Sequence, residues 1–417
     1  MRVLWIVNNL IPQASEAVGK SNSSSGTWLY EWSRRLVDKG VDLGVACVYG
    51  KTFKCFTNRG ITFYLLPGNG KNMLFYTKKY EKMWKRIVNE FKPDVIHLQG
   101  TEYNHGLACM RALPEEKYVV SIQSFISKIK KVDYGGISKK TILFNRTFRE
   151  NYRLNGLFEN HLIHKKNSKS ETEIMKRAQY AHIVNDWEEA SLRYINPNIK
   201  VFRYDYELND CFKQPPFWAF DKCNKHQIFT NPGGTPLKGI HQVLKALSIL
   251  KDKYPDIKLV VPGMGDGNRL IIRNGYSKII SKYIKKYKLE DYIQFLGYQT
   301  SLQMKEHMLD SHVFVAPSAL EGAPLMLREA MVTGCVCITS FRGGMQNYVL
   351  SGIDGFAYDF TEFEYLAYLI DKVFSMSKEE ISSISNAAIK KTKYFYNNNS
   401  FLTMLNMYKA IAEEDKQ

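Results

Sequence analysis

The chain has 417 residues, 45% of them hydrophobic and 13% aromatic, which is enough for two globular domains of about 200 residues each. No apolar run reaches the roughly 18 residues that would span a bilayer, and the seven cysteines lack a C-x-x-C pair, which argues against a metal site and favours reduced thiols. The formal net charge of +17 implies nucleic acid, an anionic membrane or an anionic substrate as a partner, unless it reflects genome composition alone.

The first half of the chain alternates short apolar runs with segments of helical spacing. The runs that predict buried strands are 2–8, 41–50, 61–67, 93–100, 118–124, 181–186 and 199–205. Helical spacing covers 27–40, 73–91 and 103–113. The start of the chain lacks the apolar region of a signal peptide, so we expect a cytoplasmic protein. Because strands and helices alternate, we expect a parallel, doubly wound sheet and assign residues 1–210 to an N-terminal domain.

Residues 128–177 are strongly basic, with thirteen Lys or Arg against five acids. Aromatic and aliphatic side chains, from Phe125 to Phe158, are interleaved with these cations. A basic and partly apolar surface suits anionic lipid headgroups. The sequence contains no recognisable nucleic-acid-binding module. We therefore expect peripheral contact with an anionic membrane, on the inner face of the plasma membrane, and no nucleic-acid partner.

Residues 211–226 interrupt the alternation with two prolines and no periodicity, and they predict an interdomain linker. Strands are expected again at 227–234, 257–263, 293–298, 313–317 and 336–340, and helices at 239–254, before 288, at 301–310 and at 324–333. Residues 227–395 are therefore assigned to a second domain, and residues 396–417 to a C-terminal helix that packs back toward the first. Two doubly wound domains imply a cleft, with ligands beyond the carboxyl ends of the strands.

The segment PSALEGAPLMLREAM, residues 317–331, joins a predicted buried strand to a helix through a tight loop. Pro324 is expected at the first helical position, where its missing N–H would be unpaired anyway. The start of such a helix binds anions through free N–H groups and the positive dipole end. Glu321 and Glu329 would repel a phosphate, so they suit the hydroxyls of a sugar or ribose beside it. The two carboxylates could also serve only the helix dipole, but the context indicates a nucleotide-sugar site.

Other strand-end loops carry groups that suit the same ligand. In residues 231–242, Gly234 and the glycine before it allow close backbone approach, and Lys238 is placed to neutralise a diphosphate. Tyr298 follows a strand-end glycine and is placed to meet a base. In the first domain, Gly26 opens a helix whose start suits phosphate.

In this order, the motifs of the second domain resemble those of the retaining glycosyltransferases of family 4. They are Lys-Gly after the first strand, G-x-G-x-G, FLGY, PSALEG, E-x7-E, GG and G-x-x-G-F, and they cover residues 228–360. The resemblance implies an α/β protein of the GT-B fold, in which two Rossmann-like doubly wound domains face a central cleft. The first domain, which matches more loosely, would then hold the acceptor and the second the donor. The NPGGTPLKG region, residues 231–239, resembles that of bacterial capsular and surface-polysaccharide glycosyltransferases.

The resemblance also implies roles for the site residues. Lys238 would bind the diphosphate, Glu321 would contact the hydroxyls of the transferred sugar, and both are expected to be catalytic. The donor-binding residues would be Gly26, Gly234, Tyr298, Gly322, Ala323, Pro324, Leu325 and Glu329. Among these, Glu329 would bind the ribose. The implied reaction moves a sugar from a nucleotide sugar to a lipid-linked or glycan acceptor hydroxyl, with retention and with neither metal nor cofactor.

Three positions depart from the pattern of the family. Gly233 stands where an Arg is usual, Gln123 where a His is usual, and Asn347 where an acid is usual. The lost cation would weaken diphosphate binding. These departures motivate one alternative, a catalytically impaired nucleotide-sugar-binding partner subunit of a transferase. The two-domain architecture leaves a second alternative, a sugar-nucleotide epimerase of the GT-B fold. His97, on a buried strand, is interpreted as a core residue.

Overall fold

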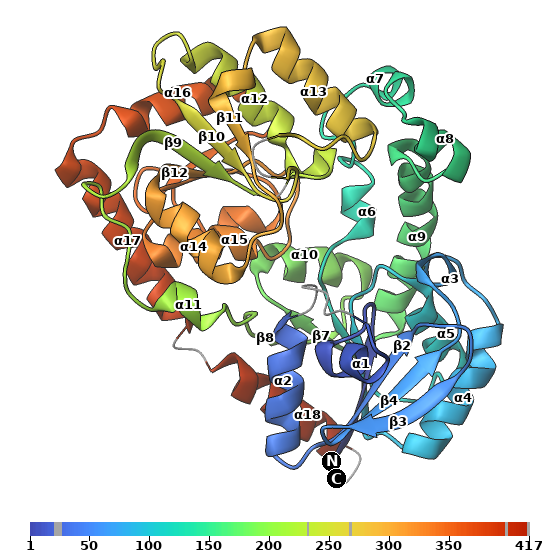
Figure 1. Cartoon of the computed structure of the whole chain (residues 1–417). Coiled ribbons are helices and arrows are strands. Elements are labelled where there is room, and N and C mark those ends of the chain that lie inside the picture. The colour runs from blue at the N-terminus through green and yellow to red at the C-terminus, as the bar shows by residue number, and fades with distance from the viewer. Residues whose placement is uncertain (21–26, 232, 267–268, 397–398, 415–417) are drawn as a thin grey trace. The chain divides into compact units, whose positions relative to one another are not determined.

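The computed structural model describes residues 1–20, 27–231, 233–266, 269–396 and 399–414, which form two compact units (Figure 1). The first unit consists of Met1–Lys130, Ile163–Glu207 and Asn398–Gln417. The second consists of Lys131–Leu162 and Leu208–Asn397. Each unit has its own sheet.

The first unit contains an eight-stranded sheet in the order β3-β4-β2-β1-β5-β6-β7-β8, parallel except for the β3–β4 pair. Its strands are β1 (Arg2–Val7), β2 (Asp42–Val48), β3 (Lys54–Asn58), β4 (Ile61–Leu66), β5 (Val95–Gln99), β6 (Tyr118–Ser121), β7 (Tyr180–Ile183) and β8 (Lys200–Arg203). The seven predicted strands are confirmed. The edge strand β3 was not predicted, because its side chains are mostly exposed and no apolar run marks it.

Helices flank this sheet and connect its parallel strands. They are α1 (Pro12–Ala17), α2 (Thr27–Asp38), α3 (Gly70–Leu74), α4 (Lys79–Phe91), α5 (Asn104–Ala112), α6 (Ile126–Ile129), α10 (Asp186–Ile195) and α18 (Ser400–Glu413). Helix α9 (Leu157–Arg177) starts in the second unit and ends in the first. Helix α1 lies in a segment where the sequence predicts no helix, because six residues are too few to show a helical period.

The second unit contains a wholly parallel sheet in the order β11-β10-β9-β12-β13-β14. Its strands are β9 (Asn224–Thr230), β10 (Lys258–Val261), β11 (Ile293–Phe295), β12 (Ser311–Ala316), β13 (Cys337–Ser340) and β14 (Phe356–Tyr358). From β9 to β11, successive strands are added on one side of β9. From β12 to β14, they are added on its other side. The order therefore reverses between β9 and β12, the place where sheets of this kind bind ligands.

Helices cover both faces of the second sheet (Figure 1). The helices of this unit are α7 (Lys139–Phe144), α8 (Phe148–Arg153), α11 (Asp210–Lys213), α12 (Ile240–Leu250), α13 (Gly275–Tyr287), α14 (Ser301–Asp310), α15 (Leu325–Thr333), α16 (Phe363–Phe374) and α17 (Lys378–Tyr396), with the 3-10 turns η1 (Pro236–Lys238), η2 (Glu290–Tyr292) and η3 (Gly344–Asn347). Helix α12 packs against α13 and α16, and α15 packs against α14 and α17. None of the helices in the described ranges combines the length and apolar character that crossing a bilayer requires.

The segment 131–162 packs within the second unit, although it precedes the predicted linker in the sequence. Ile137 and Ile142 are buried in the apolar core of that unit. His241 Nε2 and the carbonyl oxygen of Gly135 are 2.7 Å apart and share a hydrogen bond. The unit is thus assembled from two stretches of chain.

The predicted linker 211–226 is also packed within the second unit. Phe212 and Trp218 are buried in its core. The indole N–H of Trp218 donates to the carbonyl oxygen of Ser311 at 2.8 Å. This segment therefore contributes side chains to the core of the second unit.

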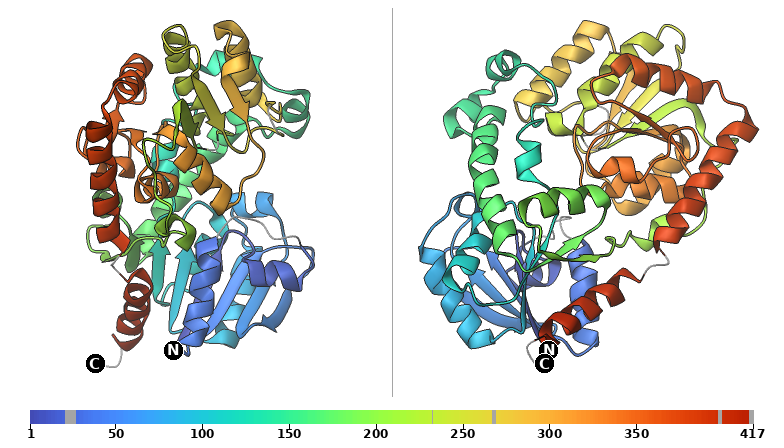
Figure 2. Two further views of the ribbon diagram at one scale, coloured as in Figure 1. Left: turned by 60° about the vertical axis from the view of Figure 1, so that its left-hand side comes forward. Right: turned by 180° about the vertical axis from the view of Figure 1, so that it is seen from behind.

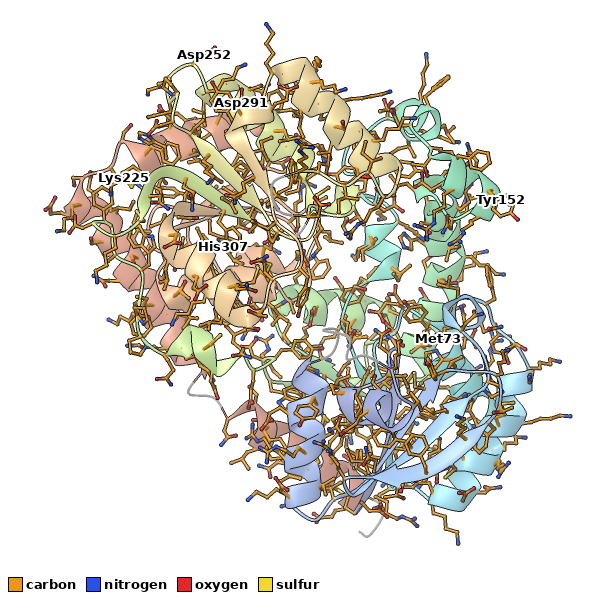
Figure 3. The ribbon with its side chains drawn as sticks, viewed as in Figure 1. Met73, Tyr152, Lys225, Asp252, Asp291 and His307 are labelled. Carbon is orange, nitrogen blue, oxygen red and sulfur yellow. The ribbon has the colours of Figure 1, made fainter. Side chains whose placement is uncertain are left out.

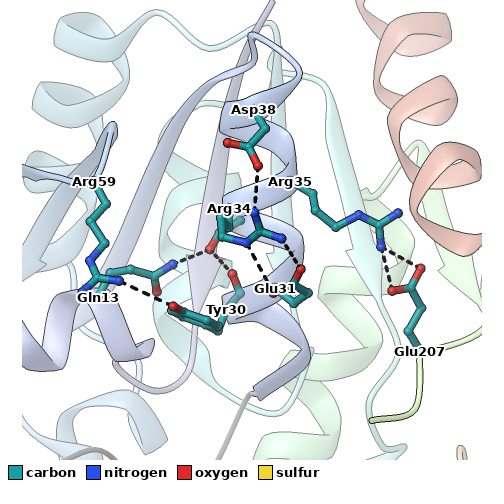
Figure 4. Close-up of polar contacts among 9 residues, drawn as sticks. Gln13, Tyr30, Glu31, Arg34, Arg35, Asp38, Arg59 and Glu207 are labelled. Carbon is teal, nitrogen blue, oxygen red and sulfur yellow. Dashed lines mark hydrogen bonds and ion pairs between the residues drawn. The ribbon is translucent and has the colours of Figure 1, made fainter. Parts of the chain in front are cut away.

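Helix α18 belongs to the first unit, the part of the chain toward which the sequence analysis expects it to pack. The Trp5 indole N–H donates to the Tyr408 hydroxyl at 2.9 Å inside the core. Arg35 of α2 binds both oxygens of Glu207 (Figure 4). The Arg35 guanidinium also lies 4.0 Å from the centroid of the Phe401 ring. One arginine of α2 thus contacts both Glu207 and α18 within the first unit.

Candidate functional site

Two loops meet at the switch point of the second sheet, one after β9 and one after β12. Ala319 N–H donates to the carbonyl oxygen of Leu237 at 2.7 Å. The Asn231 side-chain amide donates to the Ser318 hydroxyl at 3.4 Å. The loops are thereby held side by side at the carboxyl edge of the sheet, where Lys238 and Glu321 lie.

Lys238 and Glu321, the two predicted catalytic residues, form a hydrogen-bonded ion pair. Lys238 Nζ lies 2.5 Å from Glu321 Oε1. The Ser318 hydroxyl donates to the same carboxylate oxygen at 2.8 Å. The side chains of Lys238 and Glu321 are 37% and 19% exposed, so both are within reach of a ligand. The pair presents a cation and an acceptor together, which suits a ligand with a phosphate next to hydroxyl groups.

Glycines with left-handed backbone hold the Glu321 loop on both sides. At Gly239 (φ +75°), a Cβ would lie 1.7 Å from the carbonyl oxygen of Pro317. At Gly343 (φ +66°), a Cβ would lie 2.4 Å from the carbonyl oxygen of Glu321. The N–H of Gly344 donates to that same oxygen at 2.7 Å. The position of the Glu321 backbone therefore depends on the absence of side chains on both neighbours.

Helix α15 begins at Leu325, and Pro324 is its N-cap residue with a non-helical ψ of 83°. The prediction that Pro324 is the first helical residue is thus wrong by one position. The first-turn N–H groups have no intrahelical acceptor, so this helix start favours anions. Glu329 lies in the second turn, where burial raises its carboxyl pKa to about 7 against the opposing effect of Arg328. Its two protonation states are therefore nearly balanced at neutral pH.

The remaining predicted donor-binding residues that the structure describes are spread over the loops after β9, β11 and β12. Gly322 is buried and Ala323 is partly exposed, both in the loop that precedes α15. Tyr298 is 71% exposed beyond β11, two strands away from β9. Gly234 is exposed in the loop after β9. The prediction for Gly26 lies outside the described residues.

The structure gives a steric reason for one departure from the expected pattern. A Cβ on Gly233 would lie 2.0 Å from Ile240 Cγ1, so this backbone leaves no room for an arginine. Asn347 ends the turn η3. Gln123 lies in the first unit, where its side-chain amide donates to the carbonyl oxygen of Gln99 at 3.1 Å. The loop after β9 is therefore built around glycine.

Glu102, which the sequence analysis did not single out, follows β5 at the switch point of the first sheet. Its carboxylate accepts hydrogen bonds from Asn8 at 3.1 Å and from the Ser124 hydroxyl at 3.0 Å. Burial raises the pKa of this carboxyl. Its only signal in the sequence is a polar residue just after a predicted strand. His97 is confirmed as a buried core residue, hydrogen-bonded to Ser121 at 2.7 Å.

A cavity of about 550 Å³ lies in the first unit, at the carboxyl ends of β1, β2 and β4. Its polar lining includes Asn8, Asn69, Lys20 and Lys51. This lining suits a ligand with hydroxyl or anionic groups. In the part of the chain that the structure describes, no three His, Cys, Asp or Glu side chains are grouped as a metal site would need.

The sequence of the second unit matches a known family. Residues 224–391 match the family described as glycosyl transferases group 1. An uncharacterised glycosyltransferase of Bacillus subtilis, YqgM, is 28% identical over 164 residues, which are 39% of this chain and 43% of that protein. The colanic acid biosynthesis glycosyltransferase WcaL of Escherichia coli, itself assigned provisionally, is 24% identical over 169 residues, 39% of each chain. The matches thus span about two fifths of the length of these relatives.

The fold has close counterparts among solved structures. Sucrose-phosphate synthase from Thermosynechococcus elongatus superposes with a TM-score of 0.73 at 16% identity, over 99% of both chains. HepE from Anabaena, solved with UDP and glucose, gives a TM-score of 0.66 at 13% identity over 99% of this chain and 100% of that one. WaaG, a glycosyltransferase of lipopolysaccharide biosynthesis, gives a TM-score of 0.63 at 12% identity over 99% of this chain and 98% of that one. The predicted fold class, α/β of the GT-B type with two Rossmann-like doubly wound domains, is confirmed.

Proposed function

We propose that the chain is a glycosyltransferase, because residues 224–391 match the family described as glycosyl transferases group 1. It moves a sugar from a nucleotide sugar to an acceptor hydroxyl, with retention of anomeric configuration and without a metal ion, in surface or capsular polysaccharide biosynthesis. The observation that carries the proposal is the Lys238–Glu321 pair between β9 and β12, with 2.5 Å between Nζ and Oε1.

A nucleotide sugar offers a partner to each member of that pair. Its diphosphate forms an ion pair with the Lys238 ammonium. The Glu321 carboxylate, no longer paired with Lys238, accepts hydrogen bonds from the sugar hydroxyls. The first-turn N–H groups of α15 add a favourable field for the phosphates. Glu329 in its ionised form accepts a ribose hydroxyl. The likeness to HepE, which was also solved with UDP-glucose, supports a donor of this class.

The transfer needs stabilisation of the negative charge that builds up on the diphosphate. The bond between the anomeric carbon and the diphosphate oxygen breaks, and its electron pair leaves with the diphosphate. Lys238 and the start of α15 stabilise this charge, in the place that a metal ion has in other enzymes. The acceptor oxygen bonds to the anomeric carbon on the same face, and its proton passes to the departing phosphate oxygen.

The acceptor is proposed to be a lipid-linked or glycan hydroxyl that binds in the first unit. The cavity beside β1, β2 and β4 supports this assignment, because Lys20 and Lys51 suit an anionic group and Asn8 and Asn69 suit hydroxyls. The names of relatives such as WcaL and AmsK, of amylovoran biosynthesis, support a polysaccharide product.

Titration calorimetry of the full chain with UDP-, GDP- and ADP-sugars in the presence of EDTA tests the proposal. One donor is expected to bind, and Lys238→Ala should weaken it by about 10- to 100-fold, the effect of losing a hydrogen bond to a charged group. Lys393→Ala, an exposed lysine on α17, is the matched control and should bind as the wild type does. NMR of the product should show the donor's anomeric configuration. The proposal fails if no donor binds and Glu321→Ala leaves the glycan of the cell unchanged.

A catalytically impaired binding subunit is the second candidate, favoured by the glycine at position 233, which leaves no room for the usual arginine. Such a subunit would bind the donor yet release neither sugar nor nucleotide during long incubation with a partner's acceptor. Release of a single glycosylated product excludes it. A sugar-nucleotide epimerase, in contrast, would turn over the donor with no acceptor present.

A further inference from the structure

The short helix α8 buries its acidic side chain and exposes its aromatic side chains, which is the reverse of the usual amphipathic pattern. Its only acidic side chain, Glu150, is 6% exposed, whereas Phe148 and Tyr152 are 88% and 82% exposed. Phe148 and Tyr152 are four residues apart, so they lie on one face of the helix. Tyr152 projects away from the body of the second unit (Figure 3). A helix that served only the core of this unit would bury its aromatic side and expose its acid.

Polar contacts fix α8 in this orientation. Glu150 Oε1 accepts a hydrogen bond at 3.0 Å from the N–H of Gly275, the first residue of α13, so the carboxylate lies at a helix start. Its other oxygen accepts from the N–H of Thr147 at 2.8 Å in a capping box. Arg146 forms an ion pair with Glu159 at 2.7 Å. The aromatic face therefore cannot turn inward without breaking buried polar contacts.

The exposed apolar side chains of the molecule concentrate here. Six of the eighteen large hydrophobic residues that are exposed in the described ranges lie between positions 143 and 162. We call four of them the aromatic tip: Phe144, Phe148, Tyr152 and Leu154, which are 67–88% exposed. An apolar surface of this kind marks an interaction site.

Four cations lie in the same segment of the chain as the aromatic tip. Lys139, Lys140, Arg149 and Arg153 are all exposed. From Lys139 to Leu154 the only acid is Glu150, and its charge is used inside the unit. Lys140 Nζ lies 6.0 Å from the ring of Phe144. The outer surface is therefore both apolar and positive.

We infer that the aromatic tip and its four cations dock the protein on an anionic lipid bilayer. The rings enter the boundary between headgroups and acyl chains, and the cations bind phosphate headgroups. This docking surface includes fewer residues than the basic stretch 128–177. The last residues of that stretch form ion pairs within the first unit, where Glu173 binds Arg111 and Arg177 at 2.6 and 2.9 Å. The docking does not depend on the proposed transfer reaction.

Flotation with vesicles tests the inference on the full chain. The probes are vesicles of phosphatidylcholine alone and of phosphatidylcholine mixed with phosphatidylglycerol. The wild type should float with the anionic vesicles and detach at about 0.5 M salt, where screening is strong. Phe148→Ser/Tyr152→Ser should weaken binding at least about tenfold. Arg149→Gln/Arg153→Gln should weaken it roughly 25-fold, on the basis of about fivefold per cation.

Matched controls come from the same unit. Tyr365→Ser/Tyr368→Ser removes two exposed, stacked rings on α16. Lys390→Gln/Lys393→Gln removes two exposed cations on α17, which lies on the other side of the second unit from α8 (Figures 1 and 2). Both should bind vesicles as the wild type does. All variants should keep the donor affinity of the wild type, which separates loss of docking from failure of the proposed function.

Three outcomes would overturn the inference. In one, the wild type binds no anionic vesicle at low salt. In another, the tip variants float as well as the controls do. In the third, the wild type without lipid sediments as a dimer that Phe148→Ser/Tyr152→Ser dissociates, which would make the tip a contact between two copies of the chain.

Discussion

At the scale of single residues, the proposed donor binding depends on the protonation of Glu329. Burial raises the pKa of its carboxyl to about 7, so the ionised form that can accept a hydroxyl hydrogen bond is incomplete at neutral pH. About a tenth of the molecules are ionised at pH 6 and about nine tenths at pH 8. At low pH, donor binding should therefore be weaker by the free energy that is needed to ionise Glu329.

We expect the affinity for a nucleotide sugar to rise up to about tenfold from pH 6 to pH 8, because the ribose hydroxyl needs an ionised Glu329. Calorimetry across this range measures it. Glu329→Gln should bind more weakly at pH 8 and lose this part of the pH dependence. Glu379→Gln, which changes an acid in the first turn of α17, is the control. An unchanged pH profile in Glu329→Gln would show that this carboxyl does not touch the donor.

Gly239 is the residue on which the geometry of the Lys238–Glu321 pair depends. Gly239→Ala should destabilise the chain by well over the ~1 kcal/mol of an αL alanine, because its Cβ would also meet the carbonyl oxygen of Pro317 at 1.7 Å. Gly352→Ala, with a similar φ of +82° and open space around its Cβ, should cost only the conformational part. Urea unfolding measures both. Equal effects would mean that the contact with Pro317 relaxes freely.

Glu188 is buried in the first unit, and burial raises its carboxyl pKa to about 8. The folded chain therefore keeps a proton that the unfolded chain releases near its ordinary pKa of about 4.5, so this residue contributes less stability as the pH rises from 4.5 to 8. Glu188→Gln should gain stability over the wild type by ~1.4 kcal/mol per pH unit in that window. Urea unfolding at several pH values checks it.

The neighbour Glu189 provides the control for Glu188, since the hydrogen bond from Arg193 lowers its carboxyl pKa. Its contribution is present above the unfolded pKa and is lost only as the pH falls through the lower folded pKa. Glu189→Gln should therefore show no gain in stability at high pH. Parallel curves for the two variants would contradict the assignment.

The site could be predicted from sequence only to the level of individual residues. Lys238 and Glu321 were identified because each follows a buried strand at a recognisable spacing. Their direct ion pair was not predicted, because it requires the order β9-β12 and the bond from Ala319 to Leu237. The pKa of Glu329 depends on burial by distant residues, and Glu102 has no motif around it.

At the scale of elements, α18 is held to the first sheet by a buried polar cluster. The Tyr408 hydroxyl accepts from Trp5 at 2.9 Å and is hydrogen-bonded to His97 Nδ1 at 2.5 Å. Tyr408→Phe should cost about 1–3 kcal/mol of unfolding free energy, because it leaves buried polar groups unpaired. Tyr194→Phe, at an exposed position on α10, should cost nothing measurable. Urea unfolding compares the two, and equal stabilities would show that the cluster relaxes.

Elements with continuous apolar runs were predicted well, because parallel strands are buried on both faces and need no partner to be recognised. Segments whose structure depends on tertiary contacts were not. Residues 131–162 pack with the second unit because Glu150 reaches the start of α13 and Gly135 reaches His241. No local pattern announces such contacts, since the partners are more than a hundred positions away.

At the scale of the whole molecule, each unit has its own core, and the proposed donor-binding residues other than Gly26 lie in the second unit. A nucleotide at about 100 times its Kd should stabilise that unit by about 2.7 kcal/mol. Hydrogen exchange should therefore slow in β9 and β12, while the slowest amides of β1 and β5 stay unchanged. Equal protection of both sheets would mean that the two units unfold as one.

The Lys238–Glu321 ion pair has a consequence for turnover. A ligand can bind only the lysine, as the nucleoside diphosphate left after transfer would. Such a ligand leaves the Glu321 carboxylate without its cation. A complete nucleotide sugar replaces the lost cation with hydroxyl donors. The resting ion pair thus competes with the product more effectively than with the substrate. We expect weak product inhibition and easy release of the spent nucleotide, so that each cycle ends with the two side chains neutralising each other again.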